Sequence, residues 1–180
     1  MELIRNRKID TLFDADTLAA RNDALAEEIA RSGVEDLLVI AVLKGSFIFA
    51  ADLVRSLYKA GLSPEIEFIT LSSYGDGTTS SGTVRVVRDI ESEVKDRNVL
   101  LIDDILESGR TISFAKELML GRGAKSAQVA VLLDKTGKRA TDIVADYVGF
   151  ECPDYFVVGY GMDVAHAFRE LPFVGVVVDE

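Results

Sequence analysis

The chain has 180 residues, of which 48% are hydrophobic and 28% charged, and its 30 acidic and 20 basic side chains give a formal net charge of −10. This length and composition predict one folded domain with its own core, and they exclude a disordered or collagen-like chain. The excess of acid argues against a nucleic-acid partner, because such proteins normally present a basic face to the phosphate backbone. Small anionic substrates remain compatible with local clusters of cations.

The cysteine content and the N-terminus bear on the compartment. Cys152 is the only cysteine, which excludes an intramolecular disulfide, and its place in an apolar stretch before Pro153 predicts a buried thiol. Residues 1–10 alternate charged and apolar side chains without a signal region. The strongest apolar run, Leu37 to Leu43, is far shorter than the roughly 18–20 residues of a membrane span. We therefore expect a cytoplasmic protein with no membrane contact.

In chain order, the first third gives a helix, a strand and a second helix. Asp14 and Asp16 are suitable N-caps for an amphipathic helix that runs to about Arg31. The continuous apolar run 37–43 is typical of a strand covered on both faces, and apolar positions with a period of 3.6 then predict a helix over 47–59.

A long polar segment follows between two predicted strands, 65–71 and 83–90. This segment, 72–82, consists mainly of serine, glycine and threonine. It is either a mobile hairpin connection or a lid over a site, and the residues alone favour neither.

The second half continues the alternation of strand and helix. A continuous apolar strand is expected over 98–102, a helix over 111–120 and another strand over 127–133. Three short apolar runs then suggest a strand-rich C-terminal third, namely 147–150, 156–158 and 173–178. This order predicts an α/β fold with an open, mainly parallel sheet flanked by helices, in which ligands bind beyond the carboxyl ends of the strands.

The densest group of chemically active residues follows the strand at 98–102. Asp103 and Asp104 are adjacent carboxylates at its end, and the small-residue turn 107–111 then opens a helix. Carboxylates accept hydrogen bonds from vicinal ribose hydroxyls, while free N–H groups at a helix start and nearby hydroxyls suit a phosphate dianion. The alternative is that the acidic pair only ends a strand and the turn only caps a helix.

This segment resembles the phosphoribosyl-pyrophosphate signature of the type I phosphoribosyltransferases. Four further blocks, 43–46, 72–75, 132–135 and 148–169, resemble the hypoxanthine-guanine phosphoribosyltransferase family in the same order. The similarity runs from about residue 37 to residue 178. It implies a single phosphoribosyltransferase domain over 1–180, with a small hood built from chain-terminal segments, a mobile lid at about 72–82 and a strand-rich hood and base-binding part at about 145–180. A homo-oligomer, dimer or tetramer, is also implied.

For the sugar phosphate, the resemblance implies that Asp103 and Asp104 hold the ribose hydroxyls directly or through Mg²⁺. It makes Glu107 the catalytic group, the base that takes the proton from purine N7, which is chemically sensible because N9 becomes more nucleophilic as N7 is deprotonated. The family more often has Asp at this position and Glu at the position of Asp103. The implied phosphoribosyl-pyrophosphate-binding set is Lys44, Gly45, Asp103, Asp104, Ser108, Gly109, Arg110, Thr111 and Arg169.

For pyrophosphate, the resemblance implies that Lys44 binds its oxygens after a non-proline cis peptide at Leu43–Lys44. Without the resemblance, Lys44 reads as a solvated strand end. Asp163 would bind a second Mg²⁺ on pyrophosphate, and Arg169 would neutralise this leaving group. His166, the only histidine, receives no role from the motif. The implied metal ligands are Asp103, Asp104 and Asp163.

For the base, the resemblance implies that Lys135 donates a hydrogen bond to the purine 6-oxo group, which selects against the 6-amino group of adenine. Phe156 would stack on the base and Val157 would meet its edge, although composition alone favours both as core residues of a strand. Ser73 and Tyr74 would ride on the lid, which excludes water from an oxocarbenium-like transition state. The implied base-binding residues are Lys135, Phe156, Val157 and Asp163.

The resemblance thus implies a Mg²⁺-dependent enzyme of purine salvage that transfers 5-phosphoribosyl to N9 of hypoxanthine or guanine, giving IMP or GMP and pyrophosphate. Two alternatives stay open: a xanthine-preferring transferase, and a non-catalytic nucleotide-sensing regulator of the same fold. The residues disfavour the regulator, because Lys44, Glu107, Lys135, Asp163 and Arg169 are all present.

Overall fold

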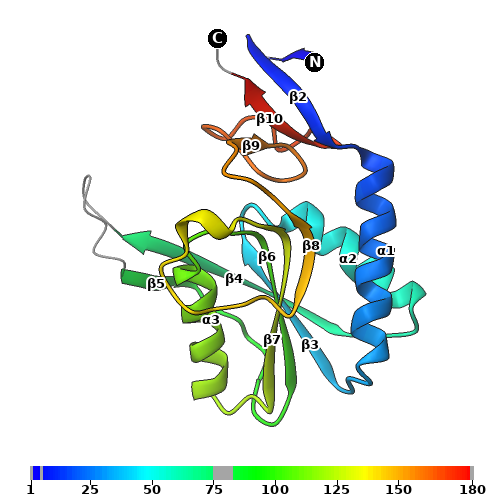
Figure 1. Cartoon of the computed structure of the whole chain (residues 1–180). Helices are drawn as coiled ribbons and strands as arrows, with labels where there is room; N and C mark the ends of the chain where they lie inside the picture. Colours follow the sequence, from blue (N-terminus) through cyan, green and yellow to red (C-terminus); the bar gives the residue numbers. More distant parts are fainter. Residues whose placement is uncertain (1, 5, 75–82, 179–180) are drawn as a thin grey trace.

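The larger of two sheets forms the body of the computed structural model, which describes residues 2–4, 6–74 and 83–178. Its six strands follow the order β5-β4-β3-β6-β7-β8, and all neighbours are parallel except β4 and β5. Figure 1 shows this sheet in the lower part of the molecule. The strands are β3 (Leu37–Leu43), β4 (Glu65–Tyr74), β5 (Thr83–Arg88), β6 (Asn98–Leu106), β7 (Ser126–Asp134) and β8 (Tyr147–Glu151).

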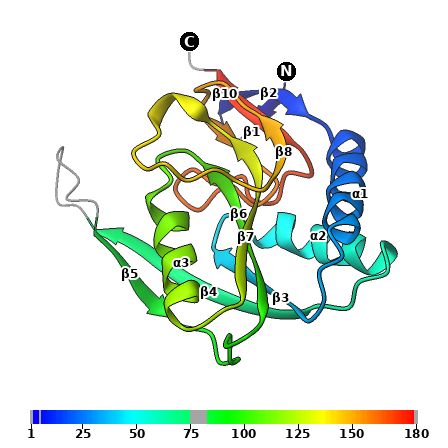
Figure 2. The ribbon, with the colours of Figure 1, turned by 60° about the horizontal axis from the view of Figure 1, so that its bottom comes forward.

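Helices cover both faces of this sheet (Figures 1 and 2). On one face, α1 (Ala15–Arg31) and α2 (Phe47–Lys59) pack on apolar side chains of β3 and β6. On the other face, α3 (Arg110–Gly121) packs on the opposite side chains of β3, β6 and β7. Because β3 is apolar at every position, it serves both cores, as the unbroken run 37–43 predicted.

A smaller sheet lies above the carboxyl ends of the central strands, and we call it the hood. It has the order β1-β2-β10-β9, with antiparallel pairs throughout, and it joins the two ends of the chain. Its strands are β1 (Glu2–Ile4), β2 (Arg7–Phe13), β9 (Val157–Val158) and β10 (Val174–Val178). The expected fold class, a mainly parallel sheet with a hood made from chain-terminal segments, is confirmed.

The sequence prediction failed at several element boundaries. Strand β4 continues through Tyr74, because Ser72 and Ser73 pair with Arg85 and Val84 of β5, so the predicted loop does not begin at Ser72. Its remaining part, 75–82, lies outside the described residues. Strand β6 also runs further than 98–102 and includes both aspartates.

Two strands and one side-chain environment were also missed. Strands β1 and β2, in which charged and apolar residues alternate, were not predicted from the sequence. Phe156 is 61% exposed, so its interpretation as a core residue is wrong, whereas Val157 is buried in β9. Cys152 is buried, as predicted, and burial raises the pKa of its thiol. Among the helices of the described residues, none has the length and apolar composition of a membrane span.

Candidate active site

The carboxyl ends of β3, β6 and β7 meet at one edge of the sheet because these strands are parallel neighbours. Strand β3 leads into Lys44, β6 carries Asp103 and Asp104 near its end, and β7 leads into Lys135. The topology therefore gathers four charged residues that lie up to 91 positions apart in the sequence, counted from Lys44 to Lys135 (135 − 44). The hood covers the same edge.

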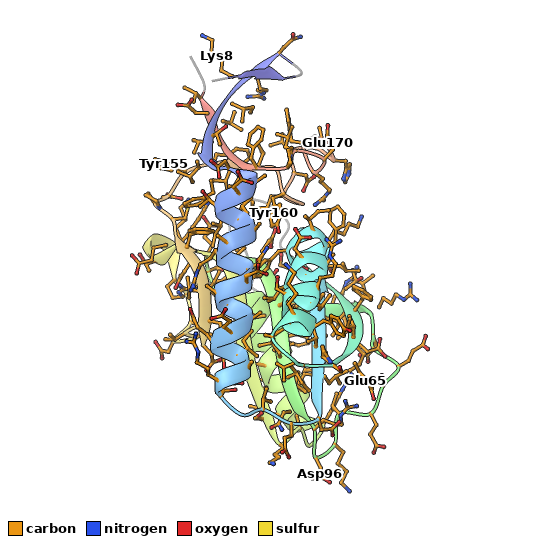
Figure 3. The ribbon with its side chains drawn as sticks, turned by 90° about the vertical axis from the view of Figure 1, so that its right-hand side faces the viewer. Lys8, Glu65, Asp96, Tyr155, Tyr160 and Glu170 are labelled. Carbon is orange, nitrogen blue, oxygen red and sulfur yellow. The ribbon has the colours of Figure 1, made fainter. Side chains whose placement is uncertain are left out.

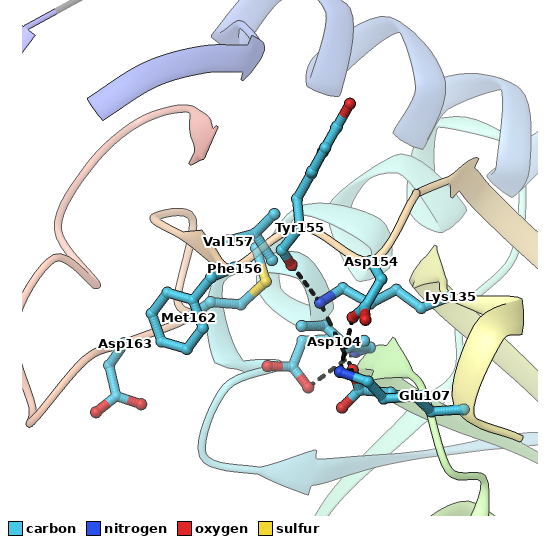
Figure 4. A pocket seen from close by; sticks show the side chains of 11 residues that line it. Asp104, Glu107, Lys135, Asp154, Tyr155, Phe156, Val157, Met162 and Asp163 are labelled. Carbon is cyan, nitrogen blue, oxygen red and sulfur yellow. Dashed lines mark hydrogen bonds and ion pairs between the residues drawn. The ribbon is translucent and has the colours of Figure 1, made fainter. Parts of the chain in front are cut away.

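A cavity of about 490 Å³ opens there between the sheet and the hood (Figure 4). Figure 4 shows Lys135 and Glu107 on one side of it and Phe156 and Asp163 on the other. The cavity thus combines an aromatic ring, a buried ammonium and several carboxylates, the ingredients of a polar ligand site. Its lining consists of Asp104, Ile105, Glu107, Lys135, Lys138, Asp154, Tyr155, Phe156, Val157, Met162 and Asp163.

A second cavity of about 200 Å³ adjoins the first at Glu107 and Ile105, which line both. Its walls are the turn between β6 and α3, and the turn passes through Gly109 in the left-handed conformation, with φ of 80°. The first N–H groups of a helix have no acceptor within the helix, so the start of α3 offers donors and a positive dipole end to an anion. The lining residues are Asp103, Ile105, Leu106, Glu107, Ser108, Gly109, Thr111 and Ile112.

Asp103 and Asp104 are both half-buried at the end of β6. Desolvation, followed by the neighbouring Asp104 carboxylate, raises the pKa of Asp103 well above its ordinary value. Asp103 Oδ1 accepts a hydrogen bond from the backbone N–H of Asp104 at 2.9 Å. Two adjacent carboxylates that are partly desolvated and repel each other are suited to ligands that supply hydrogen-bond donors or positive charge.

The buried side chain of Lys135 is 7% exposed. Its Nζ donates a hydrogen bond to the backbone oxygen of Tyr155 at 2.6 Å and lies 3.9 Å from Glu107 Oε1. Because an ammonium has three donors, this arrangement leaves capacity for a ligand acceptor in the cavity. Lys135 and Glu107, to which the resemblance gave separate roles at the base, thus line the same cavity.

The predicted aromatic and backbone contacts come from the segment before and within β9. Phe156 lines the cavity with an exposed ring, while Val157 is 6% exposed and lines it from the strand. An exposed ring beside a cavity is available for stacking on a flat ligand.

Asp163 lines the other side of the cavity and forms an ion pair with Arg169. Arg169 pairs with Asp163 Oδ1 at 2.8 Å and donates to the backbone oxygen of Gly161 at 2.6 Å. The side chain of His166 is 86% exposed and its Nδ1 is 3.8 Å from Asp163. The histidine therefore faces solvent.

The peptide bond Leu43–Lys44 is cis, in agreement with the expectation. Lys44 is exposed and Gly45 packs on Asp104, so this loop borders the carboxylate pair. Ser73 and Tyr74 do not belong to a loop, because they end strand β4 opposite Val84 and Thr83.

Sequence reasoning missed Lys138 and Asp154, which cross the mouth of the cavity. Lys138 Nζ donates to Asp154 at 2.8 Å and lies 3.6 Å from Glu107 Oε1. The hydrogen bond from Lys138 holds the pKa of Asp154 below its ordinary value. No local pattern marks such a pair, because its contact depends on the short 3₁₀ helix η1 (Thr136–Lys138) and on the loop after β8.

The residues fit a magnesium ion that completes its shell from substrate and water. Within residues 2–4, 6–74 and 83–178, no three acidic, histidine or cysteine side chains gather closely enough to hold a metal by themselves. Asp103 and Asp104 nevertheless offer hard oxygen ligands beside the smaller cavity at the turn between β6 and α3. Mg²⁺ is typically bound by one or two carboxylates together with substrate phosphates and water, which matches this donor set.

Comparison with known proteins gives a consistent result. A model of the phosphoribosyl transferase domain matches residues 8–165. The chain is 48% identical over 139 residues to the hypoxanthine-guanine phosphoribosyltransferase of Bacillus subtilis, an alignment that covers 77% of this chain and 76% of the relative. It is 41% identical over 181 residues to the enzyme of the same name from Aquifex aeolicus, with 99% and 100% covered.

Solved structures agree. A hypoxanthine-guanine phosphoribosyltransferase from Bacillus anthracis superposes with a TM-score of 0.89 at 42% identity, covering 95% of this chain and 100% of that one. A hypoxanthine phosphoribosyl transferase from Trypanosoma cruzi gives a TM-score of 0.91 at 34% identity, covering 99% and 95%; that structure concerns the role of the C-terminal region in oligomeric state and enzymatic activity.

Proposed function

Because the chain belongs to the phosphoribosyl transferase domain family, we propose that it transfers 5-phosphoribosyl from phosphoribosyl pyrophosphate to N9 of hypoxanthine or guanine. The products are IMP or GMP and pyrophosphate, so the protein serves purine salvage. The observation that carries this proposal is the junction of two cavities, one with an anion-binding turn and one with a buried lysine and an exposed aromatic ring. The relatives named above are hypoxanthine-guanine phosphoribosyltransferases.

The phosphate and the ribose occupy the β6–α3 side of the site. Ser108, Gly109, Arg110 and Thr111 surround the 5′-phosphate with backbone N–H groups and hydroxyls at the start of α3. Asp103 and Asp104 hold the ribose 2′ and 3′ hydroxyls. Their negative charge also favours the positive charge that develops on the ribose as pyrophosphate departs.

The purine occupies the larger cavity. Phe156 stacks on the ring, and Lys135 donates to the 6-oxo group. Adenine presents an amino donor at that position, so a buried ammonium would face a donor and lose its partner. The proposal therefore specifies 6-oxopurines, with Val157 at the edge of the base.

Glu107 is the general base for N7. On a 6-oxopurine, the 6-oxo group and N7 lie on the same edge of the ring system, so a carboxylate 3.9 Å from the lysine that holds the oxygen also faces N7. Removal of the N7 proton raises electron density at N9, which attacks the ribose carbon while the pyrophosphate oxygen leaves.

The pyrophosphate end of the site is formed by Lys44, Asp163 and Arg169. Asp103, Asp104 and Asp163 are the residues that would hold Mg²⁺, which supplies neutralisation of the leaving group's charge when bound. Lys44 and Arg169 add positive charge at the same end, and Gly45 allows the loop to approach Asp104.

The segment 75–82, with Ser73 and Tyr74 at its base, is the proposed lid over this transfer. One domain over 1–180 carries the whole site, with a C-terminal base-binding part at about 145–180. A cytoplasmic location follows from the single unpaired cysteine, which favours a reducing compartment.

Two copies or more of the chain are proposed to associate, as a dimer or a tetramer. Ile66 and Phe68 of β4 pair in register with Val39 and Ala41 of β3, so they point to the face that α1 and α2 cover elsewhere. They nevertheless remain 44% and 49% exposed. A second copy of the chain would remove this apolar surface from water.

The direct test is product analysis. Purified protein is incubated with hypoxanthine, phosphoribosyl pyrophosphate and Mg²⁺, and nucleotide and pyrophosphate are quantified by anion-exchange chromatography. Equal amounts of IMP and pyrophosphate support the transfer. Tight binding of GMP without turnover would support the nucleotide-sensing regulator, and turnover of xanthine above hypoxanthine and guanine would support the xanthine-preferring transferase.

A further inference from the structure

Three consecutive residues, Gly159, Tyr160 and Gly161, adopt positive φ values of 90°, 50° and 100°. Glycine takes this conformation at little cost, but a tyrosine does not, and such strain persists only where the surroundings hold it in place. The segment lies between Val157 of β9 and Asp163, so it connects the base-binding part of the site to its acidic end. A strained residue at this junction must be held in place by a neighbouring contact, which we call the anchor.

The anchor is the Tyr160 side chain, which is 5% exposed and inserts between α1 and α2 (Figure 3). Its hydroxyl donates a hydrogen bond to Asp52 of α2 and accepts one from Asn22 Nδ2 of α1 at 2.8 Å. Burial, and then the Asp52 carboxylate, raises the pKa of Tyr160 far above its ordinary value. The hydroxyl therefore keeps its proton and remains a donor at neutral pH.

The backbone of the same segment supports the loop that carries Lys44. A Cβ atom on Gly161 would lie 2.4 Å from the backbone oxygen of Gly45, so the two backbone segments touch and no side chain fits between them. On its other side, Gly45 meets Asp104, whose Oδ2 would lie 1.8 Å from a Cβ on Gly45. Asp104, Gly45 and Gly161 thus form three layers in direct contact.

The segment also positions Arg169. Its guanidinium donates to the backbone oxygen of Gly161 at 2.6 Å and pairs with Asp163 at 2.8 Å. The backbone N–H of Gly161 in turn donates to the Arg169 oxygen at 3.1 Å. Gly45, which follows Lys44, and Arg169 therefore contact this short segment directly, and Asp163 contacts Arg169.

We propose that Tyr160 is a positioning residue: its hydroxyl, held by Asp52 and Asn22, fixes the 159–161 segment between the Lys44–Gly45 loop and Arg169 and so sets the geometry of the pyrophosphate end of the site. This inference rests on the proposed function for the identity of the ligand at that end. Tyr160 itself does not line the main cavity. Its effect passes through the backbone.

The surroundings leave the segment room to shift if the anchor is lost. A cavity of about 340 Å³ adjoins Tyr160 and Arg169, with Leu18, Phe47 and Asp52 among its other lining residues. Without the hydroxyl, the ring and the segment can move toward this space, and the spacing between Lys44 and Arg169 is no longer fixed. The base cavity has its own support, because Lys135 is held by Tyr155.

The test is Tyr160→Phe, with Tyr58→Phe as the matched control, since Tyr58 lies on α2 and is 75% exposed. We expect the KM for phosphoribosyl pyrophosphate to rise about tenfold, as for the loss of a buried hydrogen-bond network, while the KM for hypoxanthine stays within about twofold. The control should match the wild type. Asp52→Asn, which keeps an acceptor for the hydroxyl, should preserve the low KM, whereas Asp52→Ala should raise it.

A binding measurement separates this inference from the proposed function. Calorimetric titration with magnesium pyrophosphate should show a similar loss of affinity in Tyr160→Phe, even if the wild type proved to lack transferase activity. An unchanged affinity in a variant with native thermal stability overturns the inference. An equal rise in the KM of both substrates, in step with a loss of thermal stability, also overturns it, because it indicates a general structural role.

Discussion

The buried ammonium of Lys135 lies 3.9 Å from the carboxylate of Glu107, on the cavity side of the sheet edge where β6 and β7 end. Lys135 is 7% exposed, while the Glu107 side chain is 41% exposed. One residue is therefore placed to hold a ligand oxygen in a buried position, and the other is accessible to solvent. This pairing is the basis of the roles proposed for both.

Replacement of the base tests its catalytic role. Glu107→Gln keeps the size of the side chain but removes the proton acceptor, so kcat should fall by about 10²–10⁴, the usual contribution of a general base. The KM for phosphoribosyl pyrophosphate should change little. Steady-state kinetics over both substrates measures the two effects.

The matched control for this position is Glu107→Asp, which retains the charge with a shorter reach and should lose less activity than the glutamine variant. If both replacements impaired phosphoribosyl pyrophosphate binding as strongly as turnover, Glu107 would be a structural part of the turn instead of the base.

Removal of the buried ammonium tests base selection. Lys135→Ala should raise the KM for hypoxanthine by about 10- to 100-fold, the range expected for a charged hydrogen bond in a buried site. The ratio of kcat/KM for hypoxanthine over adenine should fall with it. Lys138→Ala, which removes an exposed lysine near the same carboxylate, serves as control and should leave the ratio intact. Unchanged selectivity in Lys135→Ala would exclude Lys135 from base recognition.

The pKa of Asp103 predicts a gain in stability on neutralisation. Because the folded-state pKa is raised, the unfolded state ionises first as pH increases, and the folded state is penalised from about pH 4 upward. Asp103→Asn removes this penalty and keeps an oxygen to accept from the Asp104 N–H. In metal-free protein, its Tm should exceed that of the wild type at pH 7.5.

The difference in Tm should shrink as pH falls, because the wild-type carboxyl then becomes protonated. Thermal unfolding at pH 4.5, 6 and 7.5 with chelator present measures the trend. A variant that is less stable than the wild type at pH 7.5 would contradict the assignment. The transferase activity of Asp103→Asn should be lower than that of the wild type in spite of its higher Tm, since the ribose hydroxyls lose a carboxylate.

The exposed apolar pair on β4 predicts how copies of the chain associate. Phe68→Glu places a charge on the face proposed to be buried between copies, so sedimentation equilibrium should give a smaller assembly than for the wild type. Leu120→Glu on α3, on the opposite face of the sheet, should leave the assembly unchanged. Equal mass for the Phe68 variant and the wild type would place the interface elsewhere.

Much of the central fold was predictable because its strands are buried on both faces. The continuous apolar runs at 37–43 and 127–133 mark β3 and β7 within a residue at each end. The predicted strand stopped at Ile102, with the aspartates just beyond it, because Asp103 and Asp104 carry no strand signal of their own. Their strand conformation comes from pairing with β7, which a local pattern does not record.

Edge and surface features were less accessible to sequence reasoning. Strand β2 is held in the sheet by β10, whose Val176 pairs with Asp10, 166 positions earlier in the chain (176 − 10), and β1 pairs in turn with β2. The extension of β4 to Tyr74 depends likewise on β5. Lys138 and Asp154 meet through a loop contact. In each case the deciding interaction is non-local.

Within the site, motif resemblance located residues that physical patterns did not. Lys44 reads as an ordinary strand end, and Phe156 reads as a core residue, yet the structure places one beside the carboxylate pair and the other on the cavity wall. By contrast, Tyr160 stood in the matched block without an assigned role. Only its positive φ and its contacts with Asp52 and Asn22 identify it.

The central claim is that one site joins phosphoribosyl pyrophosphate to 6-oxopurines, and kcat/KM for hypoxanthine, guanine, xanthine and adenine tests it most directly. With Mg²⁺ and saturating phosphoribosyl pyrophosphate, nucleotide formation is followed by ultraviolet absorbance. Hypoxanthine and guanine should both be turned over, and kcat/KM for adenine should be lower by about 10³ or more, as expected when a buried donor is left unpaired. Comparable turnover of adenine, or no turnover of any base, would contradict it.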